Sequence, residues 1–165
     1  MKLHSKAILI IGALILSACA GPGRFGAGAN GSDVAAGSAS DPTSVAYFQQ
    51  TIGDRVLFPV DQHTLTPEAI ATLDQQAKWL MDNPEFMAVI EGHADEQGTS
   101  AYNLALSGRR ANSVIEYLVS QGVSPARLKA LPLGKERPIA LCSDESCYSQ
   151  NRRAVTVITA GAGMS

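Results

Sequence analysis

The chain has 165 residues, of which 45% are hydrophobic and 17% charged, and its formal net charge is −2. This length and this apolar fraction suit one compact domain with tails. A slightly acidic chain without a basic stripe is not expected to bind nucleic acid, so a polyanion is excluded as a ligand.

Residues 1–18 predict an export signal that is not part of the fold. Lys2 and Lys6 precede an apolar run over residues 7–16. That run is too short to span a membrane, which takes roughly 20 residues. It is followed by small residues and Cys19, a pattern that resembles a bacterial lipobox, in which the cysteine sulfur receives a lipid. An ordinary secretory signal with a nearby cysteine is the alternative.

The lipobox resemblance implies attachment of the chain to a membrane through Cys19. Ala20 follows it, and not the aspartate that retains many such proteins in the inner membrane. The resemblance therefore implies the outer membrane, with the protein on its periplasmic face. Several acyl chains on one cysteine would give stable anchoring, because a single chain binds a membrane only marginally.

Residues 19–43 predict the lipidated cysteine and a flexible linker. This stretch is rich in Gly, Ala and Ser, with almost no large apolar residue. Such a segment buries too little apolar surface to offset the entropy lost on ordering. The folded domain is expected over residues 44–165.

Within the domain, alternating and helical periodicities predict four strands and two helices. Thr66 and Pro67 supply an N-cap and a first helical residue for the first helix. The strands are expected at 55–58, 86–91, 128–133 and 153–159, and the helices at 66–82 and 100–121. The order strand–helix–strand–helix–strand–strand predicts an α/β two-layer sandwich, with helices on one face of a small mixed four-stranded sheet.

Two residues in the helices have expected packing roles. Trp79 lies off the centre of its apolar stripe, and we expect it to pack in the core rather than stack on a ligand. Gly108 is expected to allow a close approach of the second helix to the sheet, at a cost of about 1 kcal/mol in a helix interior.

Cys142 and Cys147 are the two cysteines of the domain. In an exported protein they are expected to form a disulfide. For so short a loop this would contribute roughly 2 kcal/mol. Reduced thiols are the alternative, as is a metal site, although a metal needs more ligands than two thiols and none is near in sequence.

The densest set of polar residues follows the second strand and continues into the second helix. A carboxylate at Asp95 and a guanidinium on the helix form a two-charge clamp, which suits a ligand carrying both an amine and a carboxylate. Arg109 and Arg110 point 100° apart on a helix, so only one can face the clamp. We assign Arg110 to the clamp and expect Arg109 to make a solvated or structural ion pair. Leu106 lies four residues before Arg110, on the same face.

Other residues near the clamp have structural interpretations. Asp95 could instead cap the turn or the start of the helix. His93 shares a strand face with Glu91 and Asp95, and a structural role is favoured for it. Arg152 and Arg153 lead into the last strand and are expected to form structural ion pairs.

Three ordered motifs, at 91–99, 102–111 and 151–155, resemble the OmpA-like peptidoglycan-binding domain family. The resemblance covers about residues 53–159. It implies a non-catalytic binding module, without cofactor, for the peptidoglycan stem peptide at meso-diaminopimelate. Asp95 would receive the ammonium of its D-centre, Arg110 would grip its carboxylate, and Leu106 would pack against its methylenes. We expect Asp95 and Arg110 to be partly exposed, so that either can be replaced by alanine without unfolding.

The resemblance also implies ligand contacts from the loop after the first strand and from the turn before the second helix. In the loop these are Phe58, Val60 and Asp61, although Val60 and Pro59 depart from the commoner Phe-Asp pattern and Pro59 offers no amide. In the turn and helix they are Gly98, Thr99 and Asn103.

As partners, the resemblance implies peptidoglycan and the Tol proteins of the envelope, which constrict the outer membrane during division. A small OmpA-like envelope lipoprotein without Tol partners is the near alternative. A metal-dependent hydrolase built on Glu91, His93, Asp95 and Glu96 is a distant one, because catalytic zinc sites usually use several histidines. The other histidines are His4 in the signal and His63 in a distant loop.

Overall fold

A computed structural model of the chain describes residues 37–160. The signal, Cys19 and most of the linker lie outside these residues. In chain order the elements are α1 (Val45–Tyr47), the π-helix η1 (Phe48–Gly53), β1 (Arg55–Leu57), α2 (Pro67–Asp82), β2 (Phe86–Gly92), α3 (Ser100–Ser120), the 3-10 helix η2 (Pro125–Arg127), β3 (Leu128–Pro132), α4 (Glu145–Asn151) and β4 (Arg153–Ala160). The four strands and two long helices expected from the sequence are all present.

The four strands form one mixed sheet in the order β1-β4-β2-β3. β4 is antiparallel to both of its neighbours, and β3 lies parallel to β2. The register places Val89 of β2 between Val157 of β4 and Lys129 of β3. The last strand is thus inserted between β1 and β2, which brings residues 151–153 beside the ends of both.

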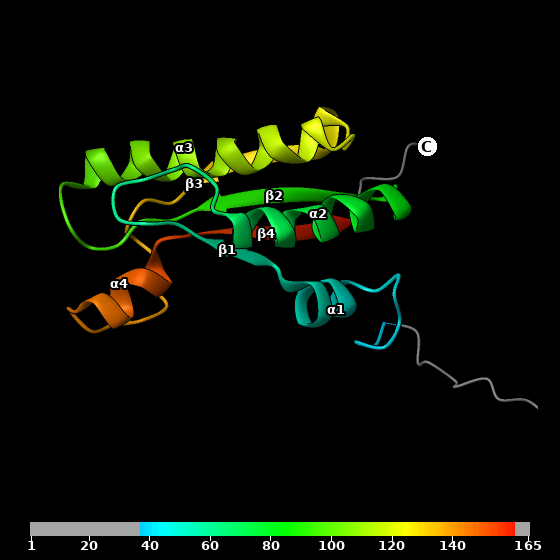
Figure 1. Ribbon diagram of the computed structural model, residues 1–165, viewed down its shortest axis with the longest axis horizontal. Helices are drawn as coiled ribbons and strands as arrows, with labels where there is room; N and C mark the ends of the chain where they lie inside the picture. The colour runs from blue at the N-terminus through cyan, green and yellow to red at the C-terminus, as the bar shows by residue number, and fades with distance from the viewer. Residues whose placement is uncertain (1–36, 161–165) are drawn as a thin grey trace, which may run out of the picture. The chain divides into compact units, whose positions relative to one another are not determined.

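The helices α2 and α3 cover one face of this sheet, as Figure 1 shows. Ala88 and Ile90 of β2 are buried on that face, and Val114 and Leu118 of α3 pack in the same core. Burial of these side chains supplies most of the stability of such a domain, at about 25 cal/mol per Å² of apolar surface removed from water. The predicted two-layer α/β architecture is confirmed.

The ends of α2 follow from local sequence. Thr66 caps the helix, its hydroxyl accepting a hydrogen bond from the Ala69 amide at 3.2 Å, and Pro67 is the first helical residue. At the other end, Arg127 donates to the carbonyls of Leu80, Asn83 and Phe86 at 2.8–2.9 Å. One guanidinium therefore satisfies carbonyls that the end of a helix leaves without partners.

The close approach between α3 and the sheet occurs at Gly92 and not at Gly108. A Cβ on Gly92 would lie 1.9 Å from the Ser107 carbonyl oxygen, whereas a Cβ on Gly108 would meet nothing nearer than Pro132 at 3.7 Å. The expectation for Gly108 was wrong, because the helix presents its main chain at Ser107, one residue earlier, to the end of β2.

Trp79 packs in the core, as expected. It is 4% exposed and its ring lies 4.9 Å from that of Phe48 and 5.2 Å from that of Phe86, measured between ring centroids. Its indole N–H donates to the Pro42 carbonyl at 2.7 Å. Residues 37–43, which the sequence assigns to the linker, form turns beside this ring.

The sequence did not predict α1, η1 or α4. Helix α4 begins after Asp144, whose carboxylate accepts from the Ser146 amide at 2.8 Å. Cys142 and Cys147 form the expected disulfide, which joins the segment before α4 to its first turn. Within residues 37–160, no helix combines the length and the apolar character that a membrane span requires.

Candidate functional site

A cavity of about 210 Å³ lies between the loop after β1, the turn after β2 and one face of α3. It is lined by Val60, Asp61, Asp95, Gln97, Gly98, Tyr102, Leu106 and Arg110. Tyr102, Leu106 and Arg110 come from α3 at a spacing of four residues, so they form a single stripe on the helix. The structure therefore brings together six of the residues singled out from the sequence and adds Gln97 and Tyr102.

Arg110 forms the buried end of that stripe. Its side chain is 0% exposed, and its guanidinium donates to three main-chain carbonyls: Gln62 at 2.8 Å, His93 at 2.8 Å and Pro59 at 3.1 Å. The expectation of partial exposure was wrong, because the helix directs this side chain inward against the loop after β1. A guanidinium carries five N–H groups, so one on each terminal nitrogen has no hydrogen bond among the described residues.

Arg110 is charged at neutral pH, although its surroundings lower its pKa. Burial lowers the pKa of Arg110 to about 10, while Asp95 and Asp61 act in the opposite direction. The guanidinium carbon also lies 5.2 Å from the centre of the Phe58 ring. Phe58 is 3% exposed; it packs against Arg110 and does not line the cavity.

Asp95 is held on both carboxylate oxygens. One accepts from the Gln97 amide at 3.2 Å, and the other accepts from Arg152 at 3.1 Å. Asp95 is 7% exposed, so the expectation of partial exposure was wrong for it too. Asp95 caps the turn, as the alternative interpretation predicts, and its carboxylate also lines the cavity.

Arg152 is the charged partner of Asp95. It is 4% exposed, and it also pairs with Glu145 of α4. Burial opposes the charge on Arg152, but the bonds to Glu145 and Asp95 outweigh it, and the pKa of Arg152 is raised. The predicted structural ion pair is confirmed for Arg152, whose acidic partners are Asp95 and Glu145. The same prediction was wrong for Arg153, which among the described residues donates to the carbonyls of Asn151 at 3.3 Å and Arg137 at 3.1 Å instead.

Asn103 and Thr99 shape the turn between β2 and α3. The side-chain amide of Asn103 donates to the carbonyls of Asp95 at 3.3 Å and Gln97 at 2.8 Å, and Asn103 is 1% exposed. Thr99 caps α3 through the Tyr102 amide at 3.2 Å. Gly98 has a φ of 90°, which favours glycine. Asn103 and Thr99 therefore position the turn and do not line the cavity.

The loop after β1 supplies the outer wall of the cavity. Val60 is 53% exposed. Asp61 has a φ of 55°, a left-handed conformation that aspartate tolerates better than most residues. Its carboxylate accepts a hydrogen bond from the Tyr102 hydroxyl, and this bond raises the pKa of Tyr102. The loop is thus tied to α3 at Asp61 and, through Pro59 and Gln62, at Arg110.

His93 and Arg109 lie outside the cavity. His93 is 2% exposed and its ring lies 3.6 Å from the Glu91 carboxylate, but neither ring nitrogen has a hydrogen-bond partner among the described residues. Burial, reinforced by Arg153 and Arg137, lowers the pKa of His93 to about 4, so the ring is neutral at pH 7. Arg109 is exposed and lies over the Tyr102 ring at 5.9 Å.

The acidic residues after β2 do not form a metal site with His93. Asp95 is bonded to Arg152, and Glu96 accepts from the Tyr148 hydroxyl at 3.0 Å. Within residues 37–160, the only grouping that could hold a metal is Cys142, Asp144 and Cys147. Two of these three are joined in the disulfide, which leaves no thiolate for coordination.

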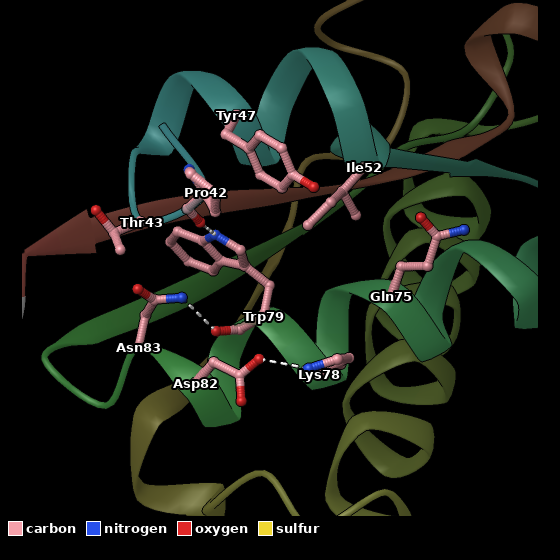
Figure 2. Close-up of a pocket in the computed structure, with 9 residues that line it drawn as sticks. All are labelled: Pro42, Thr43, Tyr47, Ile52, Gln75, Lys78, Trp79, Asp82 and Asn83. Carbon is pink, nitrogen blue, oxygen red and sulfur yellow. Dashed lines mark hydrogen bonds and ion pairs between the residues drawn. The ribbon is translucent and has the colours of Figure 1, made fainter. Parts of the chain in front are cut away.

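A second hollow, of about 340 Å³, lies beside Trp79 and is shown in Figure 2. Its wall includes Tyr47 and Ile52, and its two charged side chains, Lys78 and Asp82, pair with each other at 2.7 Å. None of the residues expected to bind a ligand lies here. Unlike the first cavity, this hollow is not lined by both a buried carboxylate and a buried guanidinium.

The sequence of the domain matches the model of the OmpA family over residues 57–152. The chain belongs to the OmpA family. The matched range begins at the end of β1 and ends at Arg152, so it contains every residue that lines the first cavity.

Relatives within the family carry a common name. The chain is 47% identical over 156 residues to the peptidoglycan-associated lipoprotein of Rhizobium meliloti, covering 94% of this chain and 88% of that one. It is 42% identical over 157 residues to the protein of the same name from Brucella suis, covering 95% and 92%.

Solved structures share the fold. The peptidoglycan-associated lipoprotein of Burkholderia pseudomallei matches with a TM-score of 0.67 at 38% identity, covering 72% of this chain and all of that one. The C-terminal domain of Helicobacter pylori MotB matches with a TM-score of 0.61 at 20% identity, covering 66% of this chain and 86% of that one. The MotB likeness shows the fold alone.

Proposed function

We propose that the protein binds peptidoglycan non-covalently through the meso-diaminopimelate of its stem peptides. One observation carries the proposal: a fixed carboxylate, Asp95, and a fixed guanidinium, Arg110, line the same small cavity. The relatives named peptidoglycan-associated lipoprotein support it. The protein is a binding protein and not an enzyme, in keeping with those relatives.

The two charges suit the D-centre of diaminopimelate, which carries an ammonium and a carboxylate on one carbon. Asp95 accepts from the ammonium, and the remaining N–H groups of Arg110 donate to the carboxylate. Leu106, 4% exposed, offers an apolar wall to the methylenes between the two centres. Hydrogen bonds to charged groups contribute about 1.5–3 kcal/mol each, so either contact accounts for roughly a tenfold or larger effect on affinity.

The test varies the ligand and not Arg110, because replacing this buried residue would also destabilise the fold. Calorimetry measures binding of a stem peptide that contains meso-diaminopimelate, beside the same peptide with lysine, which keeps the ammonium but lacks the second carboxylate. We expect the lysine peptide to bind about tenfold more weakly or worse. Equal binding of the two peptides would contradict the assignment of Arg110.

A matched pair of variants tests Asp95. Asp95→Asn keeps the shape of the side chain and removes its charge, while Arg109→Gln removes a charge that lies outside the cavity. Only Asp95→Asn should reduce co-sedimentation with sacculi, provided that circular dichroism shows both variants folded. An unchanged Asp95→Asn would remove the aspartate from the site.

We further propose that Cys19 is lipidated and that the protein tethers the outer membrane to the cell wall from the periplasmic side. The lipobox at residues 16–19 and the relatives' name support this. Labelling of cells with radioactive palmitate should mark the wild type and not Cys19→Ser. Labelling of both proteins would place the lipid elsewhere.

Partnership with the Tol proteins follows from the same similarity. We expect the protein, captured from cross-linked cells through an affinity tag, to bring Tol proteins with it. If no Tol protein is captured while peptidoglycan binding persists, the protein is a wall anchor of the OmpA family without Tol partners.

A further inference from the structure

The segment from Ile139 to Arg152 is closed on itself and contains α4; we refer to it as the disulfide-closed segment. The bond between Cys142 and Cys147 joins its two halves, and the Cys142 amide lies 3.2 Å from the Cys147 sulfur. Asn151 completes the closure, because its side chain accepts from the Ile139 amide at 2.9 Å and donates to the Ala140 carbonyl at 2.8 Å.

This segment contacts the candidate site at two points. Glu145 pairs with Arg152, and Arg152 in turn holds the Asp95 carboxylate at 3.1 Å. Tyr148 donates to the carboxylate of Glu96, the residue after Asp95, at 3.0 Å. Both acidic residues of the turn after β2 are therefore held by side chains whose positions depend on α4.

The chemistry of Asp95 makes these contacts relevant to binding. A guanidinium that paired with Asp95 alone would neutralise the carboxylate and compete with a ligand ammonium. Glu145 draws the Arg152 guanidinium toward α4, so that Asp95 shares its partner with a second carboxylate. The remaining lone pairs of Asp95 then stay available to the cavity, which this carboxylate lines.

We propose that Arg152 is a positioning residue for Asp95 and that the closed disulfide, by fixing Glu145 and Tyr148, presets the carboxylate for an ammonium-bearing ligand. The proposal rests on the proposed function and names an additional determinant of the affinity of that site. Affinity then depends on the Cys142–Cys147 bond, although neither cysteine lines the cavity.

Opening the bond is a balanced two-electron step. A dithiol such as dithiothreitol donates two electrons and two protons, the S–S bond breaks to two thiols, and the dithiol is oxidised to its own disulfide. The same opening is obtained without any reductant in the double variant Cys142→Ser/Cys147→Ser.

The experiment measures, by calorimetry, the dissociation constant of the meso-diaminopimelate stem peptide with three proteins. These are the oxidised wild type, the double serine variant, and Glu145→Gln, which removes the charge on α4 and keeps the disulfide. We expect the second and third to bind about fivefold more weakly or worse, with unchanged far-ultraviolet circular dichroism. Dithiothreitol should weaken the wild type to the same degree and leave the double variant unaffected.

A second ligand separates positioning from a general loosening of the fold. A stem-peptide analogue that lacks the side-chain amino group of diaminopimelate has nothing for Asp95 to bind. Opening the disulfide should therefore leave its affinity unchanged, whereas a general structural effect would weaken both ligands equally.

The outcomes distinguish this inference from the proposed function. If the oxidised wild type binds the peptide and the serine variant and Glu145→Gln bind it equally well, the inference is overturned and the proposed function stands. Equal weakening of the peptide and its deaminated analogue also overturns it. If the oxidised wild type binds neither the peptide nor sacculi, both are overturned.

Discussion

Arg110 is a cation with no exposed surface, and its three hydrogen bonds go to main-chain carbonyls from two separate loops. A charge can remain in such a place only when its donors are satisfied, because an unpaired buried ion is very costly. The residue therefore joins the loop after β1 to the turn after β2 before any ligand arrives. A structural role and the proposed binding role therefore fall on one side chain.

This dual role predicts that Arg110→Ala destabilises the fold as well as the site. Three carbonyls lose their donor, that of His93 in a buried position and those of Pro59 and Gln62 in partly buried ones, and we expect the free energy of unfolding to fall by about 3 kcal/mol. The measurement is the midpoint of unfolding in urea. Arg109→Ala, one residue away and exposed, is the matched control and should stay within about 0.5 kcal/mol of wild type. Equal midpoints for both variants would refute the structural role.

The lowered pKa of His93 makes the stability of the fold depend on pH. Burial and the nearby Arg153 and Arg137 lower its pKa from 6.5 to about 4, and the neighbouring Glu91 does not reverse this. The unfolded state therefore binds a proton at a higher pH than the folded state. Stability is unaffected by this group above pH 6.5 and decreases as the pH falls toward 4, by up to about 3 kcal/mol.

The check is urea unfolding of wild type and His93→Gln at several pH values between 4 and 7. The variant has no proton to gain at this position, so its stability should fall less with acid, and the difference between the two proteins should change steadily over that range. A constant difference would show that His93 does not titrate differently on folding.

At the scale of elements, the fit of α3 on the sheet depends on the absence of a side chain at Gly92. A methyl group there would overlap the Ser107 carbonyl, and a main-chain atom cannot move aside without shifting the helix. That helix carries Tyr102, Leu106 and Arg110, so any shift would also open the cavity.

We therefore expect opposite effects from two glycine-to-alanine changes. Gly92→Ala should lower the free energy of unfolding by about 3 kcal/mol through overpacking. Gly108→Ala, which meets only an ordinary contact, should leave it unchanged or raise it by up to about 1 kcal/mol through helix propensity. Thermal unfolding of both variants decides the point, and a stable Gly92→Ala would mean that the helix can move away freely.

The elements that the sequence predicted are those with a long apolar period or strong capping residues, such as the helix that Thr66 and Pro67 begin. Helix α4 is capped by Asp144 but is too short, at seven residues, to show an apolar period, and a disulfide and Asn151 close the segment that contains it. In the site, the placement of Asp95 and Arg110 at one cavity follows from the position of Asp95 just after β2 and of Arg110 on α3.

Other features of the site arise only from tertiary structure. Arg152 reaches Asp95 from 57 positions away in the chain. The burial of Arg110 depends on where the loop after β1 folds back. Tyr102 could have been predicted as a cavity residue, because it lies four residues before Leu106 and eight before Arg110, on the same helical face.

At the scale of the whole molecule, the cavity is formed by three segments that meet only in the native state. Its ligand should therefore bind the folded protein and not the unfolded chain, and binding adds to stability. At 100 times its dissociation constant, the diaminopimelate peptide should contribute about 2.7 kcal/mol.

For a domain of this size the added stability corresponds to a rise in Tm of roughly 10 °C. Scanning calorimetry with the diaminopimelate peptide, beside the lysine peptide at the same concentration, measures it. A Tm that does not respond to the first peptide at saturating concentration would argue that the cavity is not its binding site.

The bonds from Arg110 to Pro59 and Gln62 end on carbonyl oxygens, which every amino acid possesses. The side chains of residues 59–62 can therefore be substituted while the Arg110 guanidinium keeps the same carbonyl acceptors. Substitutions in this loop can therefore change the outer wall of the cavity and leave in place the acceptors that Arg110 requires.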